Sequence, residues 1–509
     1  MAATEPAGAS PSPEKDVPKA AAASDTSREK AVSAAFPPLP ALSENEFLHT
    51  SEAVTEGQID RLCDVICDDI LQASLQQDEH ARVNLTALVK SRMVVVSGEV
   101  AIKGTLDYDL LVRKTLQNCG YDSEEKTGMD YRSANVVIAI SEQSPDLASA
   151  LSLYYGGGKS EEAIQIPNGD FGTGSGYATD ESGADHFMPV SCKLANALAS
   201  QLTVARKSGQ LPWLKPNGKV QVTFVYRRDE KSGSLKPVRI YRIMVHNSGW
   251  DGKVSLPEMQ LQIKQFVIDV VLGKRISAME SASTSTSSSS AANSGTTTAT
   301  ATGGAGGEGG EDSKAKVPLP ELKETEFTFL VKKDVDVPIL HVNYTTHKSN
   351  RTFIATNSDE YQGSGAAGQR TDSMSYGGWC SSTQGGRHAS GKDPWKIERF
   401  AACAARWIAK SLVAAKLCHR CTVSLSYASN FAEPTAILFD FHHSLTSAGK
   451  QVEKKIIPVV QSNFDLRVGC LVKSLQLSSF FAGCPQLFPM VVSGASTIPV
   501  WEEPRALRV

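Results

Sequence analysis

The chain has 509 residues, of which 41% are hydrophobic and 21% charged, values typical of a soluble globular protein with room for two to four domains. Its 52 Lys and Arg against 55 Asp and Glu give a formal net charge of -3. This balance argues against a general binder of nucleic acid or of a membrane surface, because both need an excess of positive charge. A local basic site for a small anion stays possible. No apolar run approaches the roughly 20 residues of a membrane-spanning helix.

Two segments are predicted to lie outside any packed core. Residues 1–44 are rich in Ala, Pro and Ser and have no apolar stretch, so they predict a disordered tail and no secretory signal. That favours a cytoplasmic protein. Residues 278–316 are rich in Ser, Thr and Gly and predict a flexible low-complexity insertion, which is tolerable because the entropy of loop closure grows only slowly with length.

The first predicted helix covers residues 60–77. Leu62, Ile66 and Ile70 recur at intervals of four residues and give this helix one apolar face. Asp60 lies in its first turn, where a carboxylate interacts favourably with the helix dipole.

The remaining periodicities predict an alternation of strands and helices. Strands are expected at 93–98, 135–140, 219–226, 237–244, 421–428 and 435–441, the third and fourth as a hairpin and the last two as a pair. Helices are expected at 186–207, 257–273 and 394–416. Sheets with helices on one face, repeated along the chain, indicate an α+β architecture.

The ten cysteines fit reduced thiols, because they form no dense framework. Cys63 and Cys67 lie one helical turn apart, and Cys418 with Cys421 forms a CxxC motif. Neither pair has a second pair at the spacing of a zinc site. We therefore interpret these cysteines as buried or incidental thiols.

Several short motifs carry more information than the periodicities. In chain order they are SEAVTEGQIDRLCD from Ser51, Gly98-Glu99, EQSPD from Glu142, GDFG from Gly169, KPNGK from Lys215, YGGW from Tyr376 and SGKDP from Ser390. In order and spacing they resemble the S-adenosylmethionine synthetases over about residues 46–470. No single motif would suffice, but their joint register is specific.

The resemblance implies a fold of three similar α+β domains and a dimer whose active sites lie between subunits. Applied to this chain, it divides the sequence after the tail into domains at 45–150, 160–352 and 353–505. It also implies a reaction in which the sulfur of L-methionine attacks C5′ of ATP and the triphosphate leaves. That reaction needs Lys, Arg, His and Mg²⁺ around the departing polyanion, because these groups stabilise its growing charge.

Many positions match the family's functional residues in kind. Asp60 matches an aspartate that ligates Mg²⁺. Glu99, Gln143 and Asp170, the last preceded by Gly169, match residues that hold methionine. The lysines that match phosphate-binding residues are Lys219, Lys392 and Lys396. Taken alone, Asp60 could be only a helix-start carboxylate, whereas Glu99 borders an apolar strand, where an unpaired buried carboxylate would be costly.

Other positions depart from the family. Gln58 stands where the family has the histidine that assists the leaving oxygen, and glutamine can neither carry positive charge nor transfer a proton. Thr86 replaces the glutamate that binds the activating K⁺. Glu398 replaces a second Mg²⁺-ligating aspartate and is longer by one methylene.

The expected phosphate loop near residues 355–370 departs most. Gly363 stands in place of a catalytic aspartate, Gln369 in place of an arginine and Arg370 in place of a lysine. Phe353 lies next to the position of the adenine-stacking phenylalanine.

Three hypotheses follow. The chain is an active methionine adenosyltransferase with a rearranged phosphate loop, or an impaired paralogue that binds and regulates an active synthetase, or a sensor of methionine or nucleotide that works alone. The second is favoured, because the departures gather at the leaving-group end while the methionine end is retained. L-methionine, ATP, Mg²⁺ and a homo- or hetero-oligomeric partner are the expected ligands and partners.

Overall fold

The computed structural model describes residues 41–142, 170–183, 186–250, 254–273, 340–346, 376–380, 388–484 and 498–508. The chain divides into two units, Met1–Glu44 and Asn45–Val509, and the elements below belong to the second. The predictions for residues 1–40 and for the insertion at 278–316 lie outside the described residues. Among the helices of the described part, none has the length and apolar character to cross a membrane.

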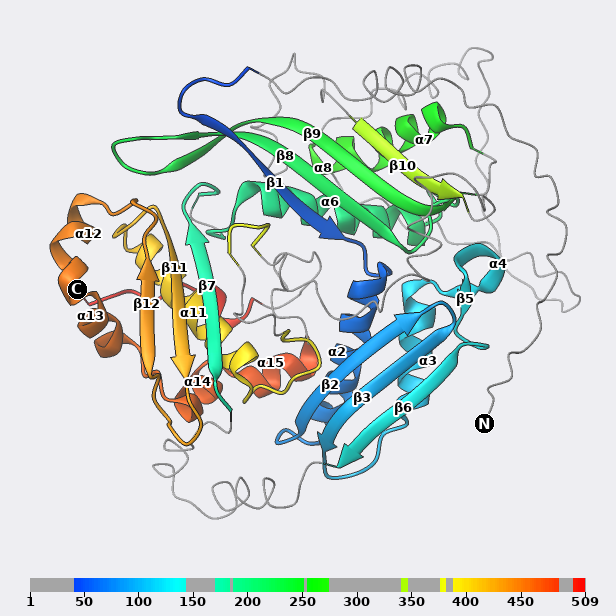
Figure 1. Ribbon diagram of the computed structural model, residues 1–509, viewed down its shortest axis with the longest axis horizontal. Coiled ribbons are helices and arrows are strands. Elements are labelled where there is room, and N and C mark those ends of the chain that lie inside the picture. The colour runs from blue at the N-terminus through cyan, green and yellow to red at the C-terminus, as the bar shows by residue number, and fades with distance from the viewer. Residues whose placement is uncertain are drawn as a thin grey trace, which may run out of the picture. The chain divides into compact units, whose positions relative to one another are not determined.

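The first sheet has the strand order β2-β3-β6. It consists of β2 (Arg82–Lys90), antiparallel to β3 (Met93–Ala101), which in turn is parallel to β6 (Asn135–Glu142). The helices α2 (Ile59–Gln77) and α3 (Tyr108–Cys119) lie against this sheet (Figure 1). The helix predicted at 60–77 and the strands predicted at 93–98 and 135–140 are confirmed.

The second sheet has the order β1-β8-β9-β10 and carries α6 (Val190–Lys207) (Figure 1). Its strands are β1 (Glu46–Val54), β8 (Gly218–Arg228), β9 (Leu235–Trp250) and β10 (Leu340–Thr346). The predicted hairpin is confirmed as the antiparallel pair β8–β9. Val220, Val222 and Phe224 share one face of β8 and are each 0% exposed, as their alternation predicted.

The third sheet has the order β12-β11-β7 and packs on α11 (Ile397–Ala414). Its strands are β7 (Gly172–Thr179), β11 (Arg420–Tyr427) and β12 (Ala436–Asp440), and the predicted pair β11–β12 is antiparallel. A Cβ on Gly176 would lie 2.1 Å from the backbone nitrogen of Arg406, so α11 approaches β7 more closely than any larger residue would allow.

Two strands pair with strands that lie in a later segment of the chain. β1 begins the chain's first sheet-and-helix segment but pairs with β8, and β7 precedes α6 but pairs with β11. Each of the three sheets has its own helical cover, and two of them combine strands from different predicted domains. The domain limits at 45–150, 160–352 and 353–505 stay predictions.

Three predicted helices differ in their bounds. The helix expected at 394–416 is α11, which begins at Ile397 and ends at Ala414. The helix expected at 186–207 begins at Val190, because Phe187 has a φ of 53° and Pro189 disfavours helical backbone at the residue before it. The helix expected at 257–273 is formed by α7 (Leu256–Ile263), a π-helical turn η2 (Lys264–Ile268) and α8 (Asp269–Val271).

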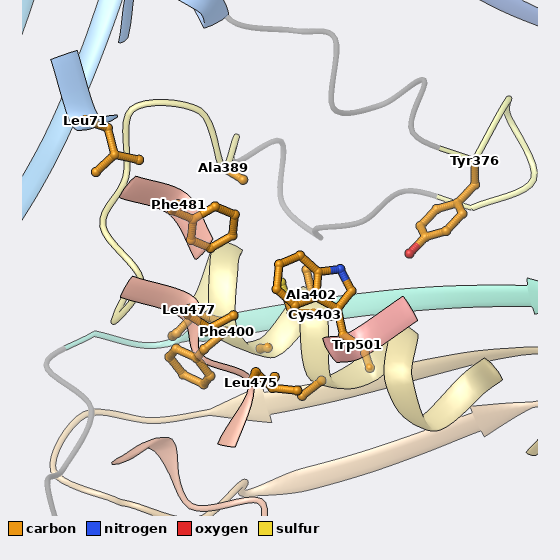
Figure 2. Packing of buried hydrophobic residues seen from close by; sticks show 14 of the residues in the cluster. Leu71, Tyr376, Ala389, Phe400, Ala402, Cys403, Leu475, Leu477, Phe481 and Trp501 are labelled. Carbon is orange, nitrogen blue, oxygen red and sulfur yellow. The ribbon is translucent and has the colours of Figure 1, made fainter. Parts of the chain in front are cut away.

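Short elements complete the described chain. They are β4 (Asp122–Ser123), α4 (Glu124–Thr127), β5 (Met129–Asp130), α12 (Ser447–Val452), η5 (Glu453–Lys455), α13 (Ile456–Asn463), α14 (Val468–Ser474), α15 (Leu477–Gly483) and η6 (Val500–Glu502). The last three join α2 and α11 in one buried hydrophobic cluster, part of which Figure 2 shows.

Candidate functional site

The start of α2 brings Gln58 and Asp60 together. Gln58 is the N-cap of α2, and its side-chain oxygen accepts a hydrogen bond from the backbone nitrogen of Arg61 at 3.0 Å. Its amide nitrogen donates to Oδ2 of Asp60 at 3.2 Å. Gln58 is only 8% exposed. The neutral amide therefore satisfies a helix terminus and one oxygen of the carboxylate expected to hold Mg²⁺.

The loop before α2 is anchored to the start of β8. The backbone nitrogen of Thr55 donates to the carbonyl of Gly218 at 3.0 Å, and its hydroxyl donates to the carbonyl of Pro216 at 2.6 Å. Val54 pairs with Lys219 in the adjacent strands. The strand pairing therefore places Lys219 at the same end of the sheet as Gln58.

Lys219 is held by a carboxylate that the sequence analysis did not single out. Its ammonium lies 2.5 Å from Oε2 of Glu52, whose other oxygen accepts a hydrogen bond from Gln221 at 2.8 Å. On the other side, Lys219 pairs with His246 of β9. Burial, and then the charge of Lys219, lower the pKa of His246, so this imidazole is neutral at neutral pH. Side chains alternate between the two faces of a strand, and this alternation along β1 and β9 could have identified Glu52 and His246 as neighbours of Lys219.

A second group gathers around Lys392. Its ammonium lies 2.7 Å from Oε1 of Glu398, which is in the first turn of α11 and 2% exposed. Lys396 is the residue immediately before α11. Lys392 also forms an isolated bridge with Asn84 of β2, which pairs with Glu99 of β3. The structure therefore brings together three predicted site residues, Lys392, Glu398 and Glu99, on or beside one sheet.

Glu99 is exposed on β3, so the burial argument made for it was wrong. The strand alternates, with Val100 buried and Glu99 on the opposite face. An exposed carboxylate at this place needs no partner for stability and can be met by a ligand.

Of the remaining predicted site residues, Asp170 lies in the described part of the chain and the others do not. Asp170 is half-buried just before β7, where its carboxylate accepts a hydrogen bond from the backbone nitrogen of Phe171 at 2.8 Å. Those that lie outside the described residues are Gln143, Gly169, Phe353, Gly363, Gln369 and Arg370.

The candidate metal ligands fit Mg²⁺ by type of donor but are already engaged. Asp60 and Glu398 offer the carboxylate oxygens that Mg²⁺ prefers, yet one oxygen of each accepts a donor from Gln58 or Lys392. Thr86, at the expected K⁺ position, is exposed on β2 and supplies a hydroxyl in place of a carboxylate. Within the part of the chain that the structure describes, no cluster of three His, Cys, Asp or Glu side chains could hold a metal ion.

The cysteine pairs are buried thiols that form no disulfide. Cys63, Cys67, Cys418 and Cys421 are each at most 1% exposed. Burial raises the pKa of Cys63 and of Cys67, while the hydrogen bond to Cys418 and then burial raise that of Cys421. Protonated buried thiols are packing residues, not nucleophiles.

Family models match the three parts of the chain in order. The N-terminal domain of S-adenosylmethionine synthetase matches residues 46–145, the central domain residues 165–289, and the C-terminal domain residues 359–489. Together these ranges cover well over half of the chain, and the three sheets with their helices agree with a three-domain fold. The chain belongs to the S-adenosylmethionine synthetase family.

Proposed function

We propose that this chain is a catalytically impaired S-adenosylmethionine synthetase, which binds methionine and nucleotide and acts as a binding or regulatory partner of an active synthetase. The observation that carries the proposal is the state of Gln58. Its two polar atoms are used to cap α2 and to bond Asp60, and its side chain is neutral.

The chemistry of the family reaction explains why that position matters. Negative charge accumulates on the triphosphate as the bond to C5′ breaks, and a preorganised cationic donor lowers the barrier only if it meets that charge in the transition state. Loss of one such group commonly costs roughly 3–4 kcal/mol, or two to three decades in rate. A glutamine at this position is expected to leave a slow catalyst.

Two of the three described lysines expected to bind phosphate support the same proposal. Lys219 lies against Glu52 and Lys392 against Glu398, so both ammonium groups are already partly neutralised. The pair of Lys392 and Glu398 is the more consequential, because its side chains are only 13% and 2% exposed and water screens them little. A triphosphate would have to displace these carboxylates or compensate for them with Mg²⁺.

The methionine half is retained in kind. Glu99 is exposed on β3, and Asp170 stands at the entry to β7. Carboxylates at such positions are suited to the ammonium group of an amino acid. Binding of methionine without efficient turnover is the combination expected of a regulatory paralogue.

One observation favours an active methionine adenosyltransferase instead. Arg61 lies in the first turn of α2, and its guanidinium is 3.7 Å from Asp64, a loose contact for an ion pair. The backbone nitrogen of Arg61 bonds the side chain of Gln58, so this cation lies within one helical turn of that position and would supply part of the lost positive charge.

Activity measurements separate the two candidates. Purified full-length protein with ATP, L-methionine, Mg²⁺ and K⁺ is expected to form little or no S-adenosylmethionine, and turnover close to that of an ordinary synthetase would overturn the proposal. Calorimetry with L-methionine should detect binding in the same preparation. Addition of an active synthetase should change that enzyme's rate and yield a mixed oligomer, whereas a lone sensor would do neither.

A further inference from the structure

The turn formed by Ala389, Ser390 and Gly391 is held at both ends by one ion pair. Nε of Arg399 donates to the carbonyl of Ala389 at 2.8 Å, and the backbone nitrogen of Gly391 donates to Oδ1 of Asp68 at 2.9 Å. Arg399 and Asp68 bond each other at 2.8 Å. This turn immediately precedes Lys392, so the ion pair determines the backbone position from which the lysine side chain extends.

The ion pair lies in the interior. The side chain of Arg399 is 1% exposed and that of Asp68 is 4% exposed. The guanidinium lies 4.4 Å from the ring centroid of Phe481. The ring of Phe481 packs against Trp501 with the ring centroids 5.7 Å apart, and Figure 2 shows these two side chains. Because removal of one partner would leave a buried charge uncompensated, loss of either side chain would strongly destabilise this arrangement.

The backbone around the turn has little freedom to move. Gly391 has a φ of 72°, and a Cβ there would lie 2.6 Å from Cβ of Cys67. Its carbonyl accepts a hydrogen bond from the backbone nitrogen of Leu85, and the backbone nitrogen of Asp393 donates to the carbonyl of Val83, both at 3.0 Å. The turn is thus clamped between α2 and the edge of β2.

We propose that Asp68 and Arg399 are positioning residues for Lys392 and Lys396. They bind no ligand themselves, because each neutralises the other inside the core. They fix the turn and the start of α11, and with them the backbone positions from which the side chains of Lys392 and Lys396 extend. The inference rests on the proposed function in one respect, namely that these lysines meet a polyphosphate.

The helix α2 links the ion pair to the residues at its own N-terminal end. It carries Gln58 and Asp60 at its start and Asp68 in its middle. One rigid element therefore sets the candidate metal carboxylate and the lysine turn in a common frame. Misplacement of a binding group by about 1 Å can cost about a hundred-fold in function, so such a frame matters for charge recognition.

Three full-length variants test the proposal. Asp68→Asn removes the charge and keeps the shape, Arg399→Lys keeps the charge and loses the bond to Ala389, and Phe481→Leu removes the ring beneath the guanidinium. Leu198→Ala is the matched control, because Leu198 is 0% exposed in the separate core around α6, and its loss destabilises without touching the turn. All are compared with the wild type well below their unfolding temperatures.

Two measurements are made on each protein. Acetic anhydride labelling read by mass spectrometry reports the accessibility of the Lys392 amine, and titration with inorganic tripolyphosphate reports anion affinity. We expect Asp68→Asn and Arg399→Lys to raise the Lys392 labelling rate at least about three-fold and to weaken tripolyphosphate binding about ten-fold. Phe481→Leu should act in the same direction more weakly, and Leu198→Ala should change neither quantity.

Unchanged Lys392 labelling in the folded variants would overturn the proposal, as would an equal change in Leu198→Ala. If Asp68→Asn does not fold, Arg399→Lys and Phe481→Leu decide the question. If the wild type itself does not bind tripolyphosphate, the proposed function fails at this site, while the labelling comparison still decides whether the ion pair positions Lys392.

Discussion

The carboxylate of Glu502 bonds the guanidinium of Arg406 at 2.9 Å, and both side chains are almost wholly buried. Lys410 bonds the same carboxylate at 3.0 Å. Arg406 also donates to the carbonyls of Tyr177 and His186, both at 2.6 Å. Glu502 thus neutralises two cations of α11, one of which also bonds the backbone of β7 and of His186.

Replacement of Glu502 should therefore destabilise the protein strongly. Glu502→Gln leaves Arg406 and Lys410 buried without a negative partner, and we expect a loss of about 3–5 kcal/mol. Glu503→Gln, at an exposed neighbouring position, should change stability by less than about 0.5 kcal/mol. Urea denaturation monitored by tryptophan fluorescence measures both, and similar midpoints for the two variants would contradict the assignment.

The same cluster predicts a loss of stability in acid. Burial alone would raise the pKa of Glu502, but the charges and hydrogen bonds of Arg406 and Lys410 outweigh it and lower the pKa. A carboxylate with a lowered folded-state pKa contributes stability above its unfolded-state value, and this stability is lost as the pH falls through the folded-state pKa. Glu502→Gln should flatten that acid limb, which thermal unfolding at a series of pH values would show.

Glu181 should give the stability of the folded protein a pH dependence of the opposite sign. Its carboxylate accepts hydrogen bonds from the backbone nitrogen of Val190 at 2.8 Å and from the hydroxyl of Tyr226 at 2.9 Å. Burial raises its pKa from an ordinary 4.5 to about 7. The folded protein therefore holds this proton more tightly than the unfolded chain, and the resulting stability declines as the pH rises from 4.5 to about 7.

Glu181→Gln removes that titration. We expect the variant to lose less stability than the wild type between about pH 5 and pH 8, in thermal unfolding at constant ionic strength. Glu230→Gln, an exposed position in the β8–β9 turn, is the control and should follow the wild type. A wild-type slope retained in Glu181→Gln would show that another group titrates.

Substitutions of Gln58 distinguish its structural role from its chemical role. Gln58→Ala should cost about 1 kcal/mol, because the N-cap of α2 is lost. Gln58→His restores an ionisable donor and should raise the rate of S-adenosylmethionine formation at least about ten-fold, if this position limits catalysis. Arg61→Gln in the same background tests whether the neighbouring cation contributes. No gain from histidine would place the defect in the loop near residues 355–370.

Gly176 should tolerate no side chain. Its Cβ would lie 2.1 Å from the backbone nitrogen of Arg406, so Gly176→Ala must separate β7 from α11, and we expect a loss of at least about 3 kcal/mol or failure to fold. Gly183→Ala meets nothing within 4 Å and should cost only about 1 kcal/mol, from its φ of 79°. Soluble yield and urea midpoints distinguish the two.

Local pattern was enough to identify several elements and the family. The four-residue spacing of Leu62, Ile66 and Ile70 predicted α2, and the alternation of Val220, Val222 and Phe224 predicted β8, because burial on one face leaves a periodic trace. The motifs around Gln58, Lys219 and Lys392 indicated the family for a related reason, since such chemistry needs particular side chains at particular spacings.

Other features came from contacts between residues far apart in the chain. β7 has the sequence GTGSGYAT and reads poorly as a strand, yet its glycines are what allow α11 to lie against it. Asp68 lies within the predicted helix and no local pattern marks it, because its partner Arg399 lies 331 residues away. Periodicity records which face of an element is buried, but the identity of the partner depends on the packing of the whole chain. The exchange of β1 and β7 between sheets and the placement of the Lys392 turn therefore emerge only once the chain is folded.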